Sequence, residues 1–540
     1  MTDATRPVAV ETPRPAVQPW PPAALAVLAL VLVSGMAMIW MARTAALTIG
    51  GDDAIHIALA RSLASGHYRD EFLVGAPPHA QYPPGMPAWL LLIGAVAGAG
   101  LDAALGANLL LLGLTVLLAA DAVRRLGYPW LAVAVAMAVI YNPALLDLTI
   151  QLRSEALYLA CCAVGLWASL RIPTHRAAGV LALVAALAAF LTRSVGIAMI
   201  PAVLAAILIH RGWRPALTGS VVAGAVVVGW FRYTAWATEI TIGHTYAKDL
   251  AVFSAPHVER GFLVRVLANV KYYLVHAIAV PFSLPDIPGQ PLDNAIVAIV
   301  LLFAGALGTW VLLRRWPALS LFFACSIGVL LVFPWAFARY FSALYPWIVI
   351  VLLFGIARAV GSRRGERVAV AVGVVLGLVG GWRQAQAAAV AQSCRAQPPY
   401  ADPRCYDPET RSFAAAAKFI TDSLPAEAII ASTKPSTVWV ATGRLAFPLE
   451  RLRDEGDSLA TLAWHPATHI LLTRLMDFEG DEVAPLLHRV CDRITLRGAF
   501  PPGTLLLTPR SAGDSAPNAC AALAHYLTDI TPQYEKAPPD

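Results

Sequence analysis

Charge is scarce in this chain, and its scarcity excludes an ordinary soluble globular protein. Only 14% of the 540 residues are Asp, Glu, Lys or Arg, whereas 58% are hydrophobic and the mean hydropathy is +0.63. Many apolar runs approach or exceed the length of about 20 residues that crosses the hydrocarbon core of a bilayer. The composition therefore predicts a polytopic α-helical membrane protein.

Motifs of several enzyme classes are also missing. No Gly-rich phosphate loop precedes a helix, which argues against a nucleotide-sugar donor and against an ATP-driven pump. The histidines His56, His79 and His244 lack the close spacing of metal ligands, so we expect no metal and no other cofactor. The formal net charge of +6 does not indicate a nucleic-acid partner, because the basic residues fall mostly in short loops between apolar runs.

Eleven apolar runs predict membrane spans, several of them shorter than a straight span prefers. They cover residues 22–41, 103–123, 129–145, 156–170, 177–191, 195–209, 217–236, 294–313, 318–335, 342–358 and 368–382. Two further apolar or amphipathic stretches, 86–100 and 262–281, are expected to be re-entrant or interfacial.

The basic residues at alternate loops, such as Arg124-Arg125 and Arg314-Arg315, predict the orientation. Basic loops remain in the cytoplasm. The protein is therefore expected in the inner (plasma) membrane, with its amino terminus in the cytoplasm. The loop 43–102 and everything after residue 382 are expected outside.

Four regions follow from this pattern. Residues 1–21, rich in Pro, Thr and Arg, predict a disordered cytoplasmic tail, and 22–382 a membrane domain. Residues 383–397 are expected to be a linker, and 398–540 a small external α/β domain. Its expected strands are 428–432, 437–440 and 468–473, and its expected helices 411–422 and 482–490.

Four of the seven cysteines lie in the external region. An oxidising compartment would allow two disulfide bonds there. Of the three pairings, Cys394 with Cys405 and Cys491 with Cys520 is the simplest.

Two adjacent carboxylates, Asp52 and Asp53, follow the first span directly. Charges at a bilayer edge are costly unless they face water or a partner, so the pair predicts a reaction site at the membrane surface. An alternative is that one of them caps the amphipathic helix that begins there, which does not exclude catalysis.

The surrounding residues resemble the GT-C superfamily of membrane glycosyltransferases, in particular the branch of protein O-mannosyltransferases and the lipid A aminoarabinose transferase. Members carry an acid pair after the first span, then an aromatic residue, a Gly-Tyr type turn and an X-Pro-Pro-Leu element. The corresponding positions here are Asp52-Asp53, His56, Ala58, Ala60, Gly66 with Tyr68, and Tyr82-Pro83-Pro84-Gly85. His56, Tyr82 and Gly85 depart from the residues usual at their positions, and these departures concern the donor contacts rather than the reaction class.

Three later segments continue the resemblance. They are Leu152-Arg153-Ser154-Glu155, Leu191-Thr192-Arg193-Ser194-Val195-Gly196 and Ala338-Arg339-Tyr340 through Pro346. The resemblance covers the membrane half well and the tail loosely.

The resemblance implies inverting transfer of a sugar, such as a mannosyl or arabinosyl group, from a polyprenyl-phosphate donor to a hydroxyl of a lipid, glycan or protein. Asp52 is expected to be the general base, since a hydroxyl of high pKa needs a carboxylate to take its proton. Asp53 would orient the acceptor or bind an arginine. Arg193 and Arg339 suit the leaving phosphate because a guanidinium donates two parallel hydrogen bonds.

The remaining candidates for substrate binding are His56, His79, Tyr82, Arg153, Glu155 and Tyr340. A structural ion pair between Arg153 and Glu155 is the alternative for those two residues.

Two other classes of protein are also polytopic. A secondary transporter would show internal repeats and charges near the middle of spans. A non-catalytic scaffold would give no common function to the acid pair and the external arginines.

Overall fold

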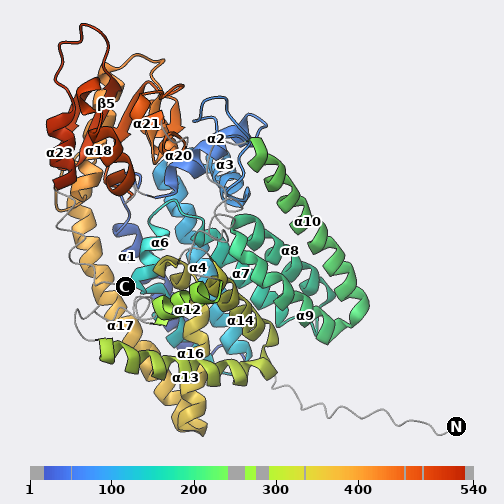
Figure 1. Ribbon diagram of the computed structural model, residues 1–540. Coiled ribbons are helices and arrows are strands. Elements are labelled where there is room, and N and C mark those ends of the chain that lie inside the picture. Colours follow the sequence, from blue (N-terminus) through green and yellow to red (C-terminus); the bar gives the residue numbers. More distant parts are fainter. Residues whose placement is uncertain are drawn as a thin grey trace.

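The computed structural model describes residues 18–49, 51–240, 262–274, 291–333, 336–454, 458–476 and 479–528. Apolar helices form a bundle, and a C-terminal domain built around a five-stranded sheet sits at one end of it (Figure 1). The expected disordered tail lies almost wholly outside the described residues.

Each expected span coincides with a helix. Among the described residues, six helices are long and apolar enough to cross a membrane by length and composition: α1 (Pro22–Met41), α4 (Leu101–Arg125), η1 with α9 (Ser194–Ala198, Met199–Arg211), α10 (Trp213–Ile240), α13 (Pro291–Arg315) and α17 (Ser362–Arg395). A seventh is the pair α5 (Pro129–Ile140) and α6 (Pro143–Thr149), bent by 60°. Shorter apolar helices are α7 (Glu155–Ser169), α8 (Arg176–Thr192), α14 (Pro317–Val332) and α16 (Tyr345–Val360). The chain is a multi-pass membrane protein.

Of the two stretches expected to be re-entrant or interfacial, the first forms α3 (Gly85–Ala97). The second contains α12 (Phe262–Tyr272), and its last residues lie outside the described part of the chain.

Helix α17 packs on α5 through small residues. A Cβ added at Gly373 would lie 2.9 Å from the Ala134 side chain, and one at Gly377 would lie 2.8 Å from that of Met137. Small residues let the backbones of membrane helices approach closely, and this contact fixes α17 against the bundle.

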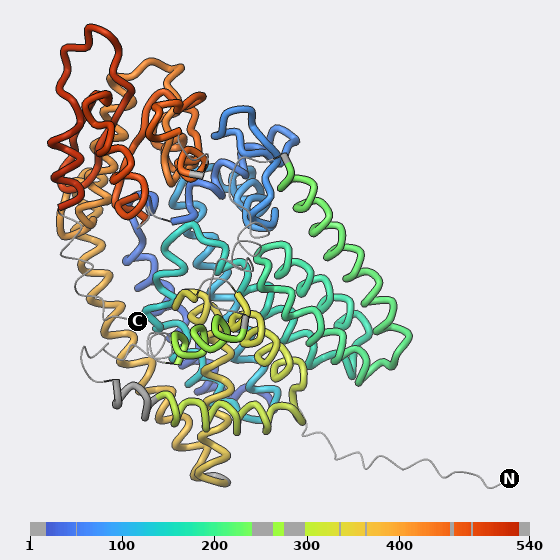
Figure 2. Tube along the Cα trace, in the orientation of Figure 1, coloured from blue at the N-terminus to red at the C-terminus, as the bar shows by residue number. Residues whose placement is uncertain are grey.

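Residues 383–395, expected to be a linker, instead continue α17 without a break. The helix has 34 residues and a length of about 51 Å, well beyond the roughly 30 Å of hydrocarbon. The first proline after Ser362 is Pro398, so nothing in this stretch stops a helix. The helix runs along the bundle and reaches the C-terminal domain (Figures 1 and 2).

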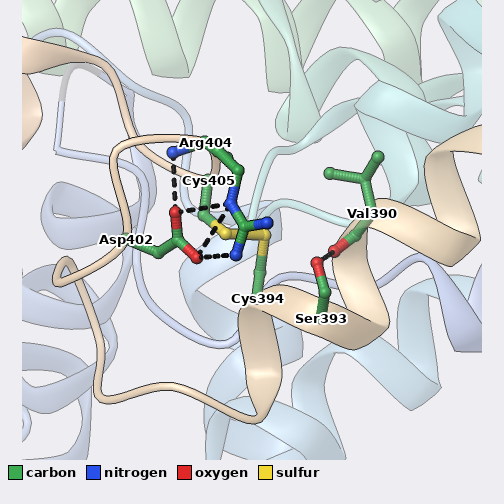
Figure 3. The surroundings of a disulfide bond; sticks show 6 residues. All are labelled: Val390, Ser393, Cys394, Asp402, Arg404 and Cys405. Carbon is green, nitrogen blue, oxygen red and sulfur yellow. Dashed lines mark hydrogen bonds and ion pairs between the residues drawn. A yellow bond between two sulfur atoms is a disulfide. The ribbon is translucent and has the colours of Figure 1, made fainter.

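Both expected disulfides are present. Cys394, in the last turn of α17, is bonded to Cys405, and the intervening loop carries an ion pair between Asp402 and Arg404 (Figure 3). Cys491 is bonded to Cys520 at the start of α23 (Cys520–Thr528). The first bond ties the end of the long helix to the chain that enters the C-terminal domain.

The sheet of the C-terminal domain has the strand order β2-β1-β3-β5-β4. Strands β2 (Ala446–Pro448), β1 (Ile430–Ser432) and β3 (His469–Leu472) are parallel, whereas β5 (Thr504–Pro509) and β4 (Ile494–Phe500) add antiparallel neighbours. Helices α18 (Pro408–Ser423), α19 (Pro435–Thr442), α20 (Leu449–Asp454), α21 (Ser458–Thr461) and α22 (Ala484–His488) accompany them.

The strand expected at 437–440 is wrong, because this stretch belongs to α19. Its residues Thr437, Val438 and Val440 have high β propensity, but Pro435 suits a first helical turn and Gly443, with φ of +69°, ends the helix. The other four expected elements correspond to β1, β3, α18 and the segment η4 (Glu479–Val483) with α22. Strands β2, β4 and β5 were not expected.

The loop after α1, which includes α2 (Asp53–Ala64), lies beside the C-terminal domain at the same end of the bundle (Figures 1 and 2). The Ala446 N–H donates to the Phe72 carbonyl at 2.9 Å, and the Tyr400 hydroxyl donates to the Leu47 carbonyl at 2.9 Å. The Arg61 guanidinium also lies over the Trp439 ring of α19. The loop that carries the acid pair is therefore fixed to the C-terminal domain and to the chain that enters it.

Candidate active site

The two adjacent acids have different surroundings. Asp53 is 1% exposed, and its Oδ2 accepts a hydrogen bond from the Thr48 N–H at 3.0 Å. The Asp52 side chain opens into a cavity, where its Oδ1 accepts from the Tyr82 hydroxyl at 3.1 Å and its Oδ2 from Arg339 at 3.0 Å. In the described part of the chain, Asp52 makes no capping hydrogen bond to α2. The capping interpretation is therefore wrong for Asp52, while Asp53 closes the turn before the helix.

The charge state of Asp52 depends on its neighbours. Burial alone would raise the pKa of this carboxyl, but Arg339, together with Lys434, holds the pKa well below its usual range. Asp52 is therefore ionised at neutral pH. Burial raises the pKa of Asp53, so the two acids also differ in their affinity for a proton.

Arg193 enters the same cavity from the junction of α8 and η1. Its Nη1 lies 2.6 Å from Oε1 of Glu155, the first residue of α7, and donates to the Ser154 hydroxyl at 3.0 Å. The ion pair expected between Arg153 and Glu155 is wrong, since Arg153 pairs with Asp147 at 3.3 Å. Residues two apart point in different directions at a helix start, and only Glu155 faces the cavity side.

Tyr340 lies close to both cavity arginines. It lies on the short helix α15 (Ala338–Ser342), and its ring centroid is 5.5 Å from the Arg193 guanidinium carbon and 5.4 Å from that of Arg339. The two guanidinium groups near this ring bring two positive charges together at the ends of membrane helices. Such a site suits a phosphate.

Five of the expected site residues line this cavity together: Asp52, Tyr82, Arg193, Arg339 and Tyr340. Apolar side chains of α14, including Val329 and Leu330, complete its wall. Among the described residues, the other five candidates lie behind this lining: Asp53, His56, His79, Arg153 and Glu155.

The substrate contacts expected for His56 and His79 do not fit their positions. His56 is 1% exposed and packs edge-on against Tyr82, with 5.2 Å between ring centroids. Burial lowers the pKa of His56 to about 4, so its ring is neutral. His79 is 2% exposed, and protein groups occupy both of its ring nitrogens.

Several residues that support the site were not found from the sequence. The Asn269 side chain of α12 donates to the carbonyls of Leu331 and Phe333 at 2.9 and 2.8 Å, and the Tyr272 hydroxyl accepts from the Ala338 N–H at 3.2 Å. These bonds fix both ends of the segment before Arg339. Only the amphipathic character of α12 gave a signal, and it did not identify these partners.

Gly85 explains one departure from the family pattern. A Cβ at this position would lie 2.7 Å from the Leu191 carbonyl oxygen and 2.7 Å from the Thr192 hydroxyl. The start of α3 therefore packs directly on the residues before Arg193, where a leucine would not fit.

Within the described residues, no group of three or more His, Cys, Asp or Glu side chains is arranged to hold a metal ion.

No protein-family model and no curated protein sequence matches this chain. Among the solved structures that share its architecture are those of two membrane glycosyltransferases. ArnT from Cupriavidus metallidurans, crystallised with bound undecaprenyl phosphate, is 15% identical with a TM-score of 0.51, over 91% of this chain and 98% of ArnT. The chain has the GT-C fold. The GT-C oligosaccharyltransferase of Archaeoglobus fulgidus, tethered to an acceptor peptide, is 12% identical with a TM-score of 0.52, over 91% of this chain and 74% of its own.

Proposed function

We propose that this protein is an inverting glycosyltransferase that moves a sugar from a polyprenyl-phosphate donor to a hydroxyl acceptor. One observation carries the proposal: an ionised carboxylate, Asp52, shares a cavity with two arginines, Arg193 and Arg339. Such a cavity combines a proton acceptor with a phosphate site. The GT-C fold and the undecaprenyl phosphate bound to ArnT support the choice of donor.

In the proposed reaction the acceptor oxygen attacks the anomeric carbon while Asp52 takes the hydroxyl proton. The bond between that carbon and the phosphate oxygen breaks, and the polyprenyl phosphate leaves with the electron pair. Arg193 and Arg339 stabilise the charge that develops on it. Attack from the face opposite the phosphate inverts the anomeric centre.

The contact between Asp52 and Arg339 links donor binding to the strength of the base. A carboxylate of low pKa is a weak proton acceptor. A donor phosphate competes for Arg339 and weakens its hold on Asp52, so donor binding raises the pKa of the base. The base is therefore strengthened when a polyprenyl phosphate group occupies the site.

A second cavity, of about 750 Å³, suits the lipid part of the donor. Its lining is apolar and comes from α12 and the residues directly after it, and from α13, α14, α15 and α16, with Tyr273, Leu331 and Phe341 among its residues. The two cavities share α14, since Leu330 lines the first and Leu331 the second. A prenyl chain would lie there while its phosphate reaches the arginines.

The proposed site lies at the end of the bundle that carries the C-terminal domain and both disulfides. Disulfides form in oxidising compartments, which supports an external, periplasmic or extracellular, position for this end. The amino terminus would then lie in the cytoplasm. A lipid, a glycan and a protein hydroxyl are all acceptors of the required chemistry, and the sugar is a hexose or a pentose.

The test is a transfer assay with the purified chain. Undecaprenyl-phosphate mannose, arabinose and aminoarabinose serve as donors, and membrane extract as the source of acceptors. We expect a product from one donor and its loss in Asp52→Asn. Retained activity in that variant would exclude Asp52 as the base, and recovery of unmodified substrate across a sealed vesicle would identify a transporter instead.

A further inference from the structure

A small hairpin in the first loop brings two buried polar residues together. Its strands are joined by the Asp70 N–H, which donates to the Pro77 carbonyl at 2.8 Å, and by the His79 N–H, which donates to the Tyr68 carbonyl at 3.0 Å. Across it, His79 Nδ1 lies 2.7 Å from Asp70 Oδ1, and both residues are at most 5% exposed. Neither residue lines the cavity in the described structure, so neither contacts a substrate there.

The contacts of His79 determine its tautomer. The Tyr82 backbone N–H lies 2.8 Å from His79 Nε2. A backbone N–H can only donate, so Nε2 carries no proton. The proton of the neutral ring is therefore on Nδ1, which donates it in a hydrogen bond to Asp70. Such a bond to a carboxylate commonly sets the tautomer of a histidine.

Tyr82 is held at every polar group by this loop. Its N–H is bound by His79, its carbonyl accepts from the Tyr68 hydroxyl at 2.7 Å, and its ring stacks on His79 with an interplanar angle of 7°. Its hydroxyl then reaches Asp52 Oδ1 at 3.1 Å. A continuous chain of contacts runs from Asp70 through His79 and Tyr82 to Asp52.

We propose that Asp70 and His79 are positioning residues that orient the general base through Tyr82. The inference rests on the proposed function. Arg339 binds Oδ2 of Asp52 and Tyr82 binds Oδ1, so the carboxylate is fixed at both oxygens before the donor arrives. When the donor phosphate draws Arg339 away, Tyr82 keeps the carboxylate in place, and Oδ2 is the oxygen released to take the proton.

The first test is a double-mutant cycle in the transfer assay. Tyr82→Phe and His79→Ala are each expected to lower kcat about tenfold, with little change in the donor KM because the two arginines are untouched. In the Tyr82→Phe background, His79→Ala should cost less than about threefold more, because the hydroxyl through which it acts is already missing. Losses that multiply would overturn the proposal.

Rescue separates positioning from packing. Gln at position 79 places an amide oxygen where Nε2 accepts from Tyr82, so His79→Gln should recover most of the kcat that His79→Ala loses. His67→Ala, an exposed histidine of the same loop, is the matched control and should leave the rate unchanged. Equal losses in the Gln and Ala variants would contradict the assignment.

A structural measurement tests the pair without any transfer reaction. Electron cryomicroscopy of the full chain in nanodiscs should show the Tyr82 hydroxyl displaced from Asp52 in His79→Ala, with the contact between Arg339 and Asp52 retained. Binding of undecaprenyl phosphate should be unchanged. If the wild type transfers none of the sugars, the proposed function fails, whereas an undisplaced Tyr82 in the variant overturns the positioning role alone.

Discussion

Arg339 Nη2 lies 3.0 Å from Asp52 Oδ2, although 287 residues separate the two in the chain. The contact joins the turn after the first membrane helix to the segment before α16. It ties the proposed phosphate site to the proposed base, and the pH dependence of the reaction should reflect it.

Replacing Arg339 by Ala should shift the acid limb of the rate profile. Arg339 is the strongest of the groups that lower the pKa of Asp52, so its removal raises that pKa, and activity should be lost at a higher pH on the acid side. Loss of a charged contact to the donor phosphate should also raise the donor KM by about tenfold or more. Profiles of kcat/KM against pH measure both effects. Arg339→Lys keeps the charge and should move the acid limb less; an acid limb at the same pH in Arg339→Ala would refute the coupling.

Lys434 should contribute a smaller shift of the same sign. It precedes α19 in the C-terminal domain and also lowers the pKa of Asp52. We expect the acid limb of Lys434→Ala to lie between those of the wild type and Arg339→Ala. Lys418→Ala, an exposed lysine of α18 paired with Asp422, is the control and should show the wild-type profile. Identical profiles for both lysine variants would mean that the C-terminal domain does not act on the base.

A methyl group at Gly85 should disturb the site from behind. Because its Cβ would lie 2.7 Å from the Leu191 carbonyl, α3 must move away from the turn that carries Arg193. Overpacking of this kind costs roughly 1–3 kcal/mol, and transfer should fall by about tenfold. Gly94→Ala, in the same helix with its nearest neighbour at 3.9 Å, should be tolerated. Thermal unfolding and transfer rates of the two variants decide the point.

The C-terminal domain should lose stability as the pH rises. Glu479 is fully buried, and burial raises its pKa to about 8 from 4.5, against hydrogen bonds from Thr473. The folded protein keeps this proton where the unfolded chain has released it, so the stability falls between about pH 4.5 and pH 8 and is then constant. Glu479→Gln should remove this slope, while Glu482→Gln, a partly exposed neighbour, should keep it. Hydrogen exchange of the β3 amides across this pH range measures the effect, and parallel slopes in all three proteins would contradict it.

Local patterns predicted most of the fold, and five of the ten candidate site residues line the cavity. In the described part of the chain, apolar runs identified every candidate span, and Asp52, Arg193 and Arg339 were found because each stands at a span end within a short motif. The sequence did not predict which of the charged residues form ion pairs with one another. Glu155 binds Arg193 rather than Arg153 because the side-chain directions at the start of α7 are set by tertiary packing.

The errors share a physical cause, which is that contacts between distant segments override the local pattern. Residues 437–440 have β propensity, yet Pro435 and the packing of α19 on α2 favour a helix. His79 was expected to bind a substrate, but the hairpin turns it toward Asp70. Lys434 and Asn269 carry no local signal, since their roles exist only after distant segments meet.

Helix α17 is much longer than the hydrocarbon is thick, and its last turn is tied by the disulfide of Cys394 to the chain that enters the C-terminal domain, so a tilt of the helix would move that domain. A ten-degree tilt of a rod of about 51 Å carries its tip roughly 9 Å sideways. Membrane helices tilt when bilayer thickness changes. The same domain is hydrogen-bonded to the loop of Asp52, because the Ala446 N–H donates to the Phe72 carbonyl. A movement of the domain would therefore shift the position of the proposed base. Transfer rates in bilayers of graded acyl-chain length should therefore pass through an optimum. Equal rates at all chain lengths would show that the tilt of α17 does not affect the reaction.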